Sequence, residues 1–118
     1  MMDVAEKITF IKTFDPDGAA RLERLLGKEE TLKTTGNVYK ERFTGRQFSL
    51  VFDPLIDSVF ERARVLEVLS KGNDTIPGIA TKLGVGKDRV FNHTKDLMRK
   101  NLIEIASHEE RDALFRKK

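Results

Sequence analysis

The sequence predicts an α+β protein, with helices through its middle and short strands toward both ends. Apolar side chains recur at helical spacing through residues 54–100. Short segments rich in β-branched and aromatic residues flank that region on both sides. The 118 residues, 39% hydrophobic and 35% charged, suit one small domain with an extension. We therefore expect an N-terminal extension over residues 1–53, for dimerisation or packing, and a C-terminal domain over residues 54–118.

The extension is expected to begin with a strand followed by a helix. Ile8–Phe14 alternates in part and is rich in strand-forming residues. Asp15 and Pro16 then form a helix start, with an N-cap side chain and a proline at the first helical position. Leucines at helical spacing follow, and Gly27 can end the helix.

A hairpin is expected to complete the extension. Residues 28–37 are polar and predict a loop. Val38–Phe43 and Arg46–Phe52 predict two strands around Thr44-Gly45, with Phe48, Leu50 and Phe52 on one face.

The C-terminal domain is expected to open with a helix from Asp53-Pro54 to Lys71. A break near Arg62 would make two helices of it. Thr75 and Pro77 predict the start of a second helix. Its apolar face is Ile76, Ile79, Ala80 and Leu83.

Gly84 supplies a left-handed turn, and a third helix runs from about Lys87 to Lys100-Asn101. Its buried face is predicted to contain Val90, Thr94 and Leu97, with Met98 as a further candidate. Two strands, Leu102–Ala106 and Asp112–Arg116, are expected to form a hairpin after it.

This order resembles the winged helix-turn-helix superfamily, in the manner of ArsR- and MarR-type regulators. The resemblance covers about residues 63–118 and rests on the pattern Ile76-x-x-Ile79-Ala80-x-x-Leu83-Gly84-Val85-Gly86-Lys87-x-x-Val90-x-x-His93-x-x-x-Leu97-x-x-x-Asn101-Leu102-Ile103. It implies a winged helix-turn-helix with a small N-terminal strand-helix-hairpin extension.

The resemblance also implies that the third helix enters the major groove of double-stranded DNA. Arg89 and Asn92 are the expected base readers, because Arg pairs with guanine and Asn with adenine. Phosphate contacts are expected from Lys87, Lys95 and Arg99. The remaining candidate contacts are Thr75 and Lys82 on the preceding helix, His93 on the third helix, and Arg111 and Arg116 on the wing.

Charge supports this reading, with two departures from the family pattern. Residues 75–103 carry six Lys or Arg against two Asp, a net charge of +4. Asp88 either caps the helix or accepts a bond from cytosine. Phe91 either touches a thymine methyl group or packs against the N-terminal half. The wing tip is acidic, and the hairpin could instead serve only to close the core.

Other chemistry finds little support. The absence of cysteine excludes disulfides and thiolate metal sites. Gly84–Lys87 lacks the flanking residues of a phosphate-binding loop, and His93, His108, Glu109 and Glu110 match no standard zinc spacing. We therefore expect no enzyme activity, cofactor or metal. No apolar run could cross a membrane and no signal peptide is visible, so a cytoplasmic location is expected.

The sequence thus predicts a sequence-specific DNA-binding transcriptional regulator. The alternative is a winged-helix module that binds protein and has no role with nucleic acid, and RNA binding is a third reading. A homodimer formed through residues 1–53 is expected, because that segment holds many aromatic residues and strand edges that need cover. The rival arrangement folds this half back onto its own winged helix.

Overall fold

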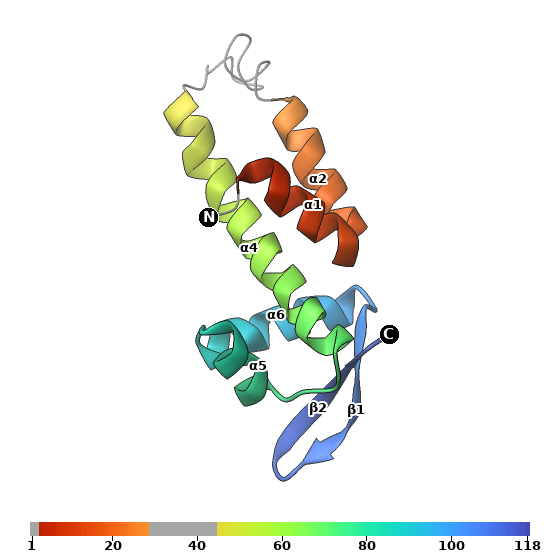
Figure 1. Ribbon diagram of the computed structural model, residues 1–118. Coiled ribbons are helices and arrows are strands. Elements are labelled where there is room, and N and C mark those ends of the chain that lie inside the picture. Colours follow the sequence, from red (N-terminus) through yellow and green to blue (C-terminus); the bar gives the residue numbers. More distant parts are fainter. Residues whose placement is uncertain (1–2, 29–44) are drawn as a thin grey trace. The chain divides into compact units, whose positions relative to one another are not determined.

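A computed structural model describes residues 3–28 and 45–118, which form five helices and a two-stranded antiparallel sheet (Figure 1). The α+β class is therefore confirmed. The chain divides into two compact units, residues 1–60 and 61–118. The predicted strand Val38–Phe43 and almost all of the predicted loop over residues 28–37 lie outside the described residues.

Helix α1, Val4–Phe14, replaces the strand predicted for Ile8–Phe14, and that prediction is wrong. Asp3 caps the helix by accepting a bond of 2.8 Å from the amide of Glu6. Ile8 and Ile11 are both buried, three residues apart on one helical face. Burial of that face outweighs the strand preference of the β-branched residues.

Helix α2, Pro16–Gly27, confirms the predicted start at Asp15-Pro16. The Asp15 carboxylate accepts a bond of 3.2 Å from the amide of Gly18. Leu22 is buried, and Leu25 and Leu26 are half-buried. In the same unit the ring of Phe10 lies 5.1 Å from that of Phe60, measured between centroids.

Helix α4, Gly45–Ser70, corrects three predictions. Arg46–Phe52 is helical rather than a strand, Pro54 lies inside the helix rather than at its start, and no break occurs near Arg62. Phe52 and Ile56 are buried four residues apart, so one apolar face continues through the proline. A proline in the interior of a helix usually kinks or breaks it, and here burial of the continuous apolar face outweighs that tendency.

The second unit contains the end of α4, then helices α5, Ile76–Leu83, and α6, Lys87–Arg99. The predicted caps are confirmed. The Thr75 hydroxyl accepts a bond of 3.2 Å from the amide of Gly78. Gly84 has φ of +70°, a left-handed conformation that reverses the chain after α5, and Asn101 has φ of +60° after α6.

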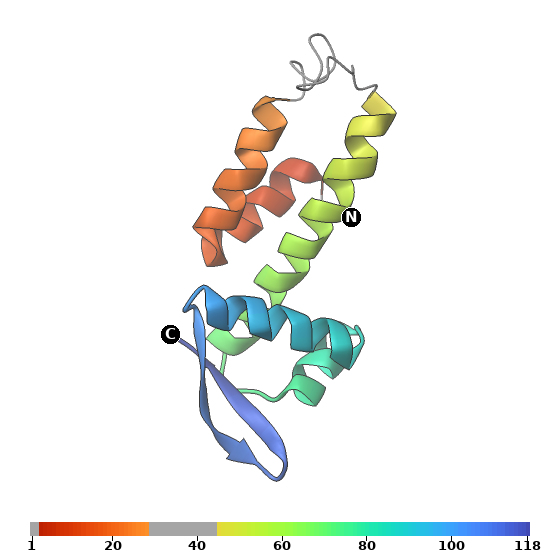
Figure 2. The same cartoon turned by 180° about the vertical axis from the view of Figure 1, so that it is seen from behind.

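A β-hairpin follows, and its tip projects beyond the helices of this unit (Figure 2). The strands are β1, Ile103–Glu109, and β2, Asp112–Lys117, so β1 is three residues longer than predicted at its outer end. The register shifts between Ile105 and Ser107, which leaves Ala106 as the extra residue of a bulge. Asp74 pairs with Phe115, which ties the segment before α5 to the hairpin.

The core of the second unit gathers side chains from every element. Ile79 and Ala80 of α5 are buried, and Ile76 and Leu83 are half-buried, so the predicted apolar face of that helix is confirmed. The buried apolar residues of this unit are Ala63, Val65, Leu66, Leu69, Ile79, Ala80, Val90, Leu97, Ile103 and Phe115.

No helix in the described parts of the chain combines the length and apolar character needed to span a bilayer.

Candidate nucleic-acid interface

Helix α6 has one buried and one exposed side. Side chains rotate by about 100° per residue along a helix, so residues three and four apart share a side. Val90, His93, Thr94 and Leu97 form the buried side. The exposed residues of the opposite side follow at intervals of three and four: Asp88, Asn92, Lys95 and Arg99.

Two lysines on this helix have no carboxylate partner within residues 3–28 and 45–118. Neither Lys87 nor Lys95 forms an ion pair with any residue that the structure describes, and both are exposed. Arg99 is weakly paired, with its Nη1 3.8 Å from Oδ1 of Asp96. These cations are therefore available to an external anion, and Asn92 lies exposed among them.

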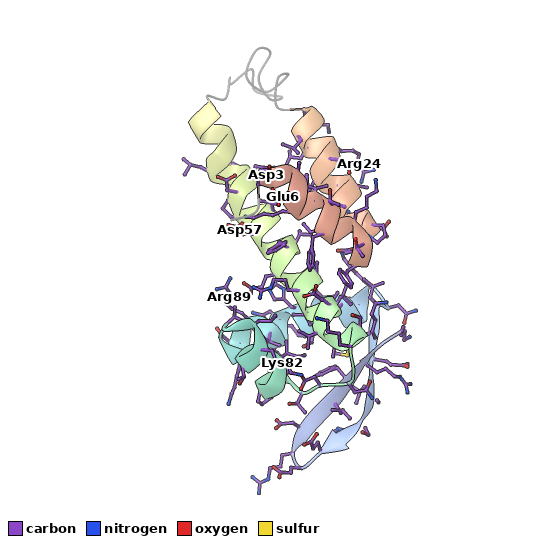
Figure 3. All side chains as sticks on the ribbon, in the orientation of Figure 1. Asp3, Glu6, Arg24, Asp57, Lys82 and Arg89 are labelled. Atoms are coloured by element: carbon purple, nitrogen blue, oxygen red, sulfur yellow. The ribbon has the colours of Figure 1, made fainter. Side chains whose placement is uncertain are left out.

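Arg89 and His93 instead share a carboxylate on α4. Arg89, labelled in Figure 3, donates from Nη2 to Oε2 of Glu61 at 2.7 Å. Nε2 of His93 lies 3.0 Å from Oε1 of the same carboxylate. The His93 residue is only 8% exposed. His93, named above as a candidate DNA contact, is therefore buried rather than exposed, and its contact with Glu61 satisfies a polar ring inside the unit.

The charge of the two-helix segment is also partly neutralised from outside it. Nζ of Lys82 lies 2.6 Å from Oδ2 of Asp74, and Thr75 uses its hydroxyl as a helix cap. The net charge of residues 75–103 therefore overstates the positive charge that faces outward.

The hairpin adds a separate group of charges. Arg116 donates from Nε to Oε1 of Glu104 at 2.9 Å across the two strands. This hydrogen bond, with the charge of the same guanidinium, holds the pKa of the Glu104 carboxyl below its ordinary value. Arg111 is exposed at the tip beside Glu109 and Glu110, so the tip has mixed charge.

The sequence did not indicate two contacts at this surface. Glu61 lies 28 residues before Arg89 and outside any recognisable motif. Nζ of Lys95 lies 5.4 Å from the centroid of the Phe91 ring, one helical turn away. The spacing of four residues was the available signal for this second contact. Asp88 provides no side-chain cap, since the N-cap position of α6 is Gly86.

Two shallow clefts lie within the second unit, both away from the exposed side of α6. One, about 400 Å³, is lined by residues 69–73 and 116–118, and the other, about 280 Å³, lies between the ends of α4 and α5. The described residues contain no group of three or more His, Asp or Glu arranged to hold a metal ion.

No family model, no curated protein and no solved structure matches this chain. Its function is therefore inferred from its own residues.

Proposed function

We propose that this protein is a transcriptional regulator that binds double-stranded DNA, and that residues 61–118 act as a winged helix-turn-helix. The order of elements supports the proposal, with α5 and α6 joined by a tight turn at Gly84 and followed by a projecting hairpin. In this arrangement α6 enters the major groove.

The exposed side of α6 is the observation that supports DNA most directly. It presents Asn92, which can bond adenine through paired contacts, near Lys87 and Lys95, which have no carboxylate partner among the residues that the structure describes. Lys87 and Lys95 are the proposed phosphate contacts, with Arg99. Double-stranded DNA fits this combination, because its phosphates can pair with the lysines and its base edges can bond the Asn92 amide.

Arg89 remains a proposed base reader, with Glu61 as its support. A guanidinium has five N–H donors, and the bond to Glu61 uses one of them. The remaining donors are available for guanine. Lys82, Thr75 and Arg111 are proposed as secondary contacts to the DNA backbone.

Substitutions on α6 separate base reading from phosphate contact. Asn92→Ala is expected to relax preference at one base position and cost about 1–3 kcal/mol on the selected site. Lys95→Ala is expected to weaken binding to all duplexes alike. Selection from a random DNA pool, followed by affinity measurement on the selected duplex, provides both readouts.

Lys12→Ala is the matched control, because this exposed lysine lies on α1 in the other unit. It should change neither base preference nor affinity. An Asn92→Ala variant with the wild-type motif and affinity would contradict the proposed role of Asn92.

We also propose that the protein binds DNA as a homodimer formed through its first unit. The strand edges expected there do not occur at Ile8–Phe14 or Arg46–Phe52, which are helical. Leu50, Val51 and Leu55 of α4 are instead exposed, and such apolar side chains favour association. Two copies would read two half-sites.

Light scattering across a concentration series tests this assembly. The wild type is expected at twice the 13.5 kDa mass of one chain. Leu50→Ser combined with Leu55→Ser should shift the mass to that of one chain. Ile105→Ser, a change of an exposed apolar residue on β1, should leave the dimer intact. A wild-type protein that stays at one chain mass at every concentration would rule out the dimer.

A further inference from the structure

Phe91 is an aromatic residue left exposed on an otherwise polar part of α6. Half of its surface, 50%, is accessible. Its neighbours on the exposed surface are Asn92 and Lys95, and the Lys95 ammonium lies 5.4 Å from the ring centroid. The ring therefore shares a surface with the groups proposed to contact DNA.

The backbone at Phe91 is fixed by the helix and its neighbours. Val90, immediately before it, is fully buried, and the Thr94 hydroxyl donates to the Phe91 carbonyl at 2.8 Å. A rotation of about 100° separates the side chains of residues 90 and 91. Within this unit Phe91 cannot enter the core while Val90 occupies it.

Charge around the ring indicates what kind of partner covers it. Lys87 and Lys95 lie four residues to either side of Phe91, and neither has a carboxylate partner among the described residues. A polyanion satisfies these cations and also covers the ring, whereas a purely apolar protein surface would leave them buried and unpaired. The surface therefore favours nucleic acid over an apolar partner.

In the major groove only thymine presents an apolar group, its 5-methyl. We propose that Phe91 contacts a thymine methyl group and is a specificity-determining residue of this interface. The inference rests on the proposed function and adds that the binding site contains a thymine recognised through its methyl group. Lys95, whose ammonium lies 5.4 Å from the ring centroid, remains a proposed phosphate contact beside it.

Deoxyuridine provides the sharpest test, because it lacks only the 5-methyl group and pairs as thymine does. Each thymine of the selected duplex is replaced in turn. The wild type is expected to lose about fourfold in affinity at one position, the value of one buried methyl group. Phe91→Ala is expected to bind the thymine duplex more weakly and to show no further loss with deoxyuridine at that position.

Two further variants complete the design. Met98→Ala removes another exposed apolar side chain of α6 and should retain the wild-type response to deoxyuridine. Phe91→Leu keeps an apolar group and should retain part of the response. Because Phe91 is exposed, its variants should unfold at the same temperature as the wild type, and a thermal melt followed by circular dichroism checks this.

The possible failures are distinguishable. A wild-type protein that binds its selected duplex but tolerates deoxyuridine at every position overturns the thymine contact and leaves the proposed function standing. A Phe91→Ala variant with the full wild-type response also overturns it. A wild-type protein that binds no duplex overturns the proposed function and this inference together.

Discussion

Affinity for duplex DNA is expected to fall by about 1,000-fold between 50 and 200 mM salt, if two copies each neutralise three phosphates. Each phosphate contact releases a condensed counterion, and the free energy gained from this release falls as the salt concentration rises. The contacts proposed for each copy are Lys87, Lys95 and Arg99, which lie exposed on α6. Fluorescence anisotropy with a labelled duplex, repeated across a salt series, measures the slope.

The same series with variants identifies the surface that bears the charge. Lys95→Ala should reduce the slope by about one for each copy bound, whereas Lys12→Ala on α1 should leave it unchanged. A slope near zero would contradict the proposed interface. No binding to any duplex at low salt would instead favour the alternative reading of a protein-binding module.

Leu97→Ala is expected to destabilise the protein by about 2–5 kcal/mol, through lost burial and the cavity left behind. Leu97 has no exposed surface and lies on the buried side of α6. Urea denaturation followed by circular dichroism measures the change.

Met98→Ala is the control for this substitution, because the neighbouring Met98 is exposed and its change should stay within about 0.5 kcal/mol. Leu83→Ala should cost less than Leu97→Ala, since Leu83 is half-buried. Equal stability of the Leu97→Ala variant and the wild type would show that α6 does not pack as described.

The second unit was largely predictable because local chemistry defines its boundaries. Thr75 caps α5, and Gly84 and Asn101 adopt the left-handed conformations expected after α5 and α6. Each of these signals acts within a few residues, so the sequence displays it directly. The hairpin differed in the length of its strands and in the bulge at Ala106.

The first unit was predicted less well because its signals conflict. Ile8–Phe14 contains residues that favour strands, yet Ile8 and Ile11 have the spacing of a helical face. Pro54 suggested a helix start, although Phe52 and Ile56 extend one buried face across it. Tertiary burial decided both cases, and local propensity cannot reveal that burial.

At the candidate site, sequence supplied the charged residues but not their partners. Glu61 lies on α4, far along the chain from Arg89 and His93, and no periodicity links them. Asp74 lies one residue outside the segment over which charge was counted, and it pairs with Lys82. Such pairings depend on how the helices pack, which only the three-dimensional structure provides.

The bulge at Ala106 separates the orientation of the hairpin tip from the packing at its base. Ile105 pairs opposite Phe115 before the bulge, and Ser107 pairs opposite Leu114 after it. Because residues paired directly across two strands share a face, deleting Ala106 would leave Ser107 opposite Leu114 and would remove only the bend and extra twist that the bulge introduces. The buried Phe115 would keep its partner. Single-residue insertions and deletions at this position are therefore a route by which related sequences could re-aim the outer part of the hairpin without disturbing the core.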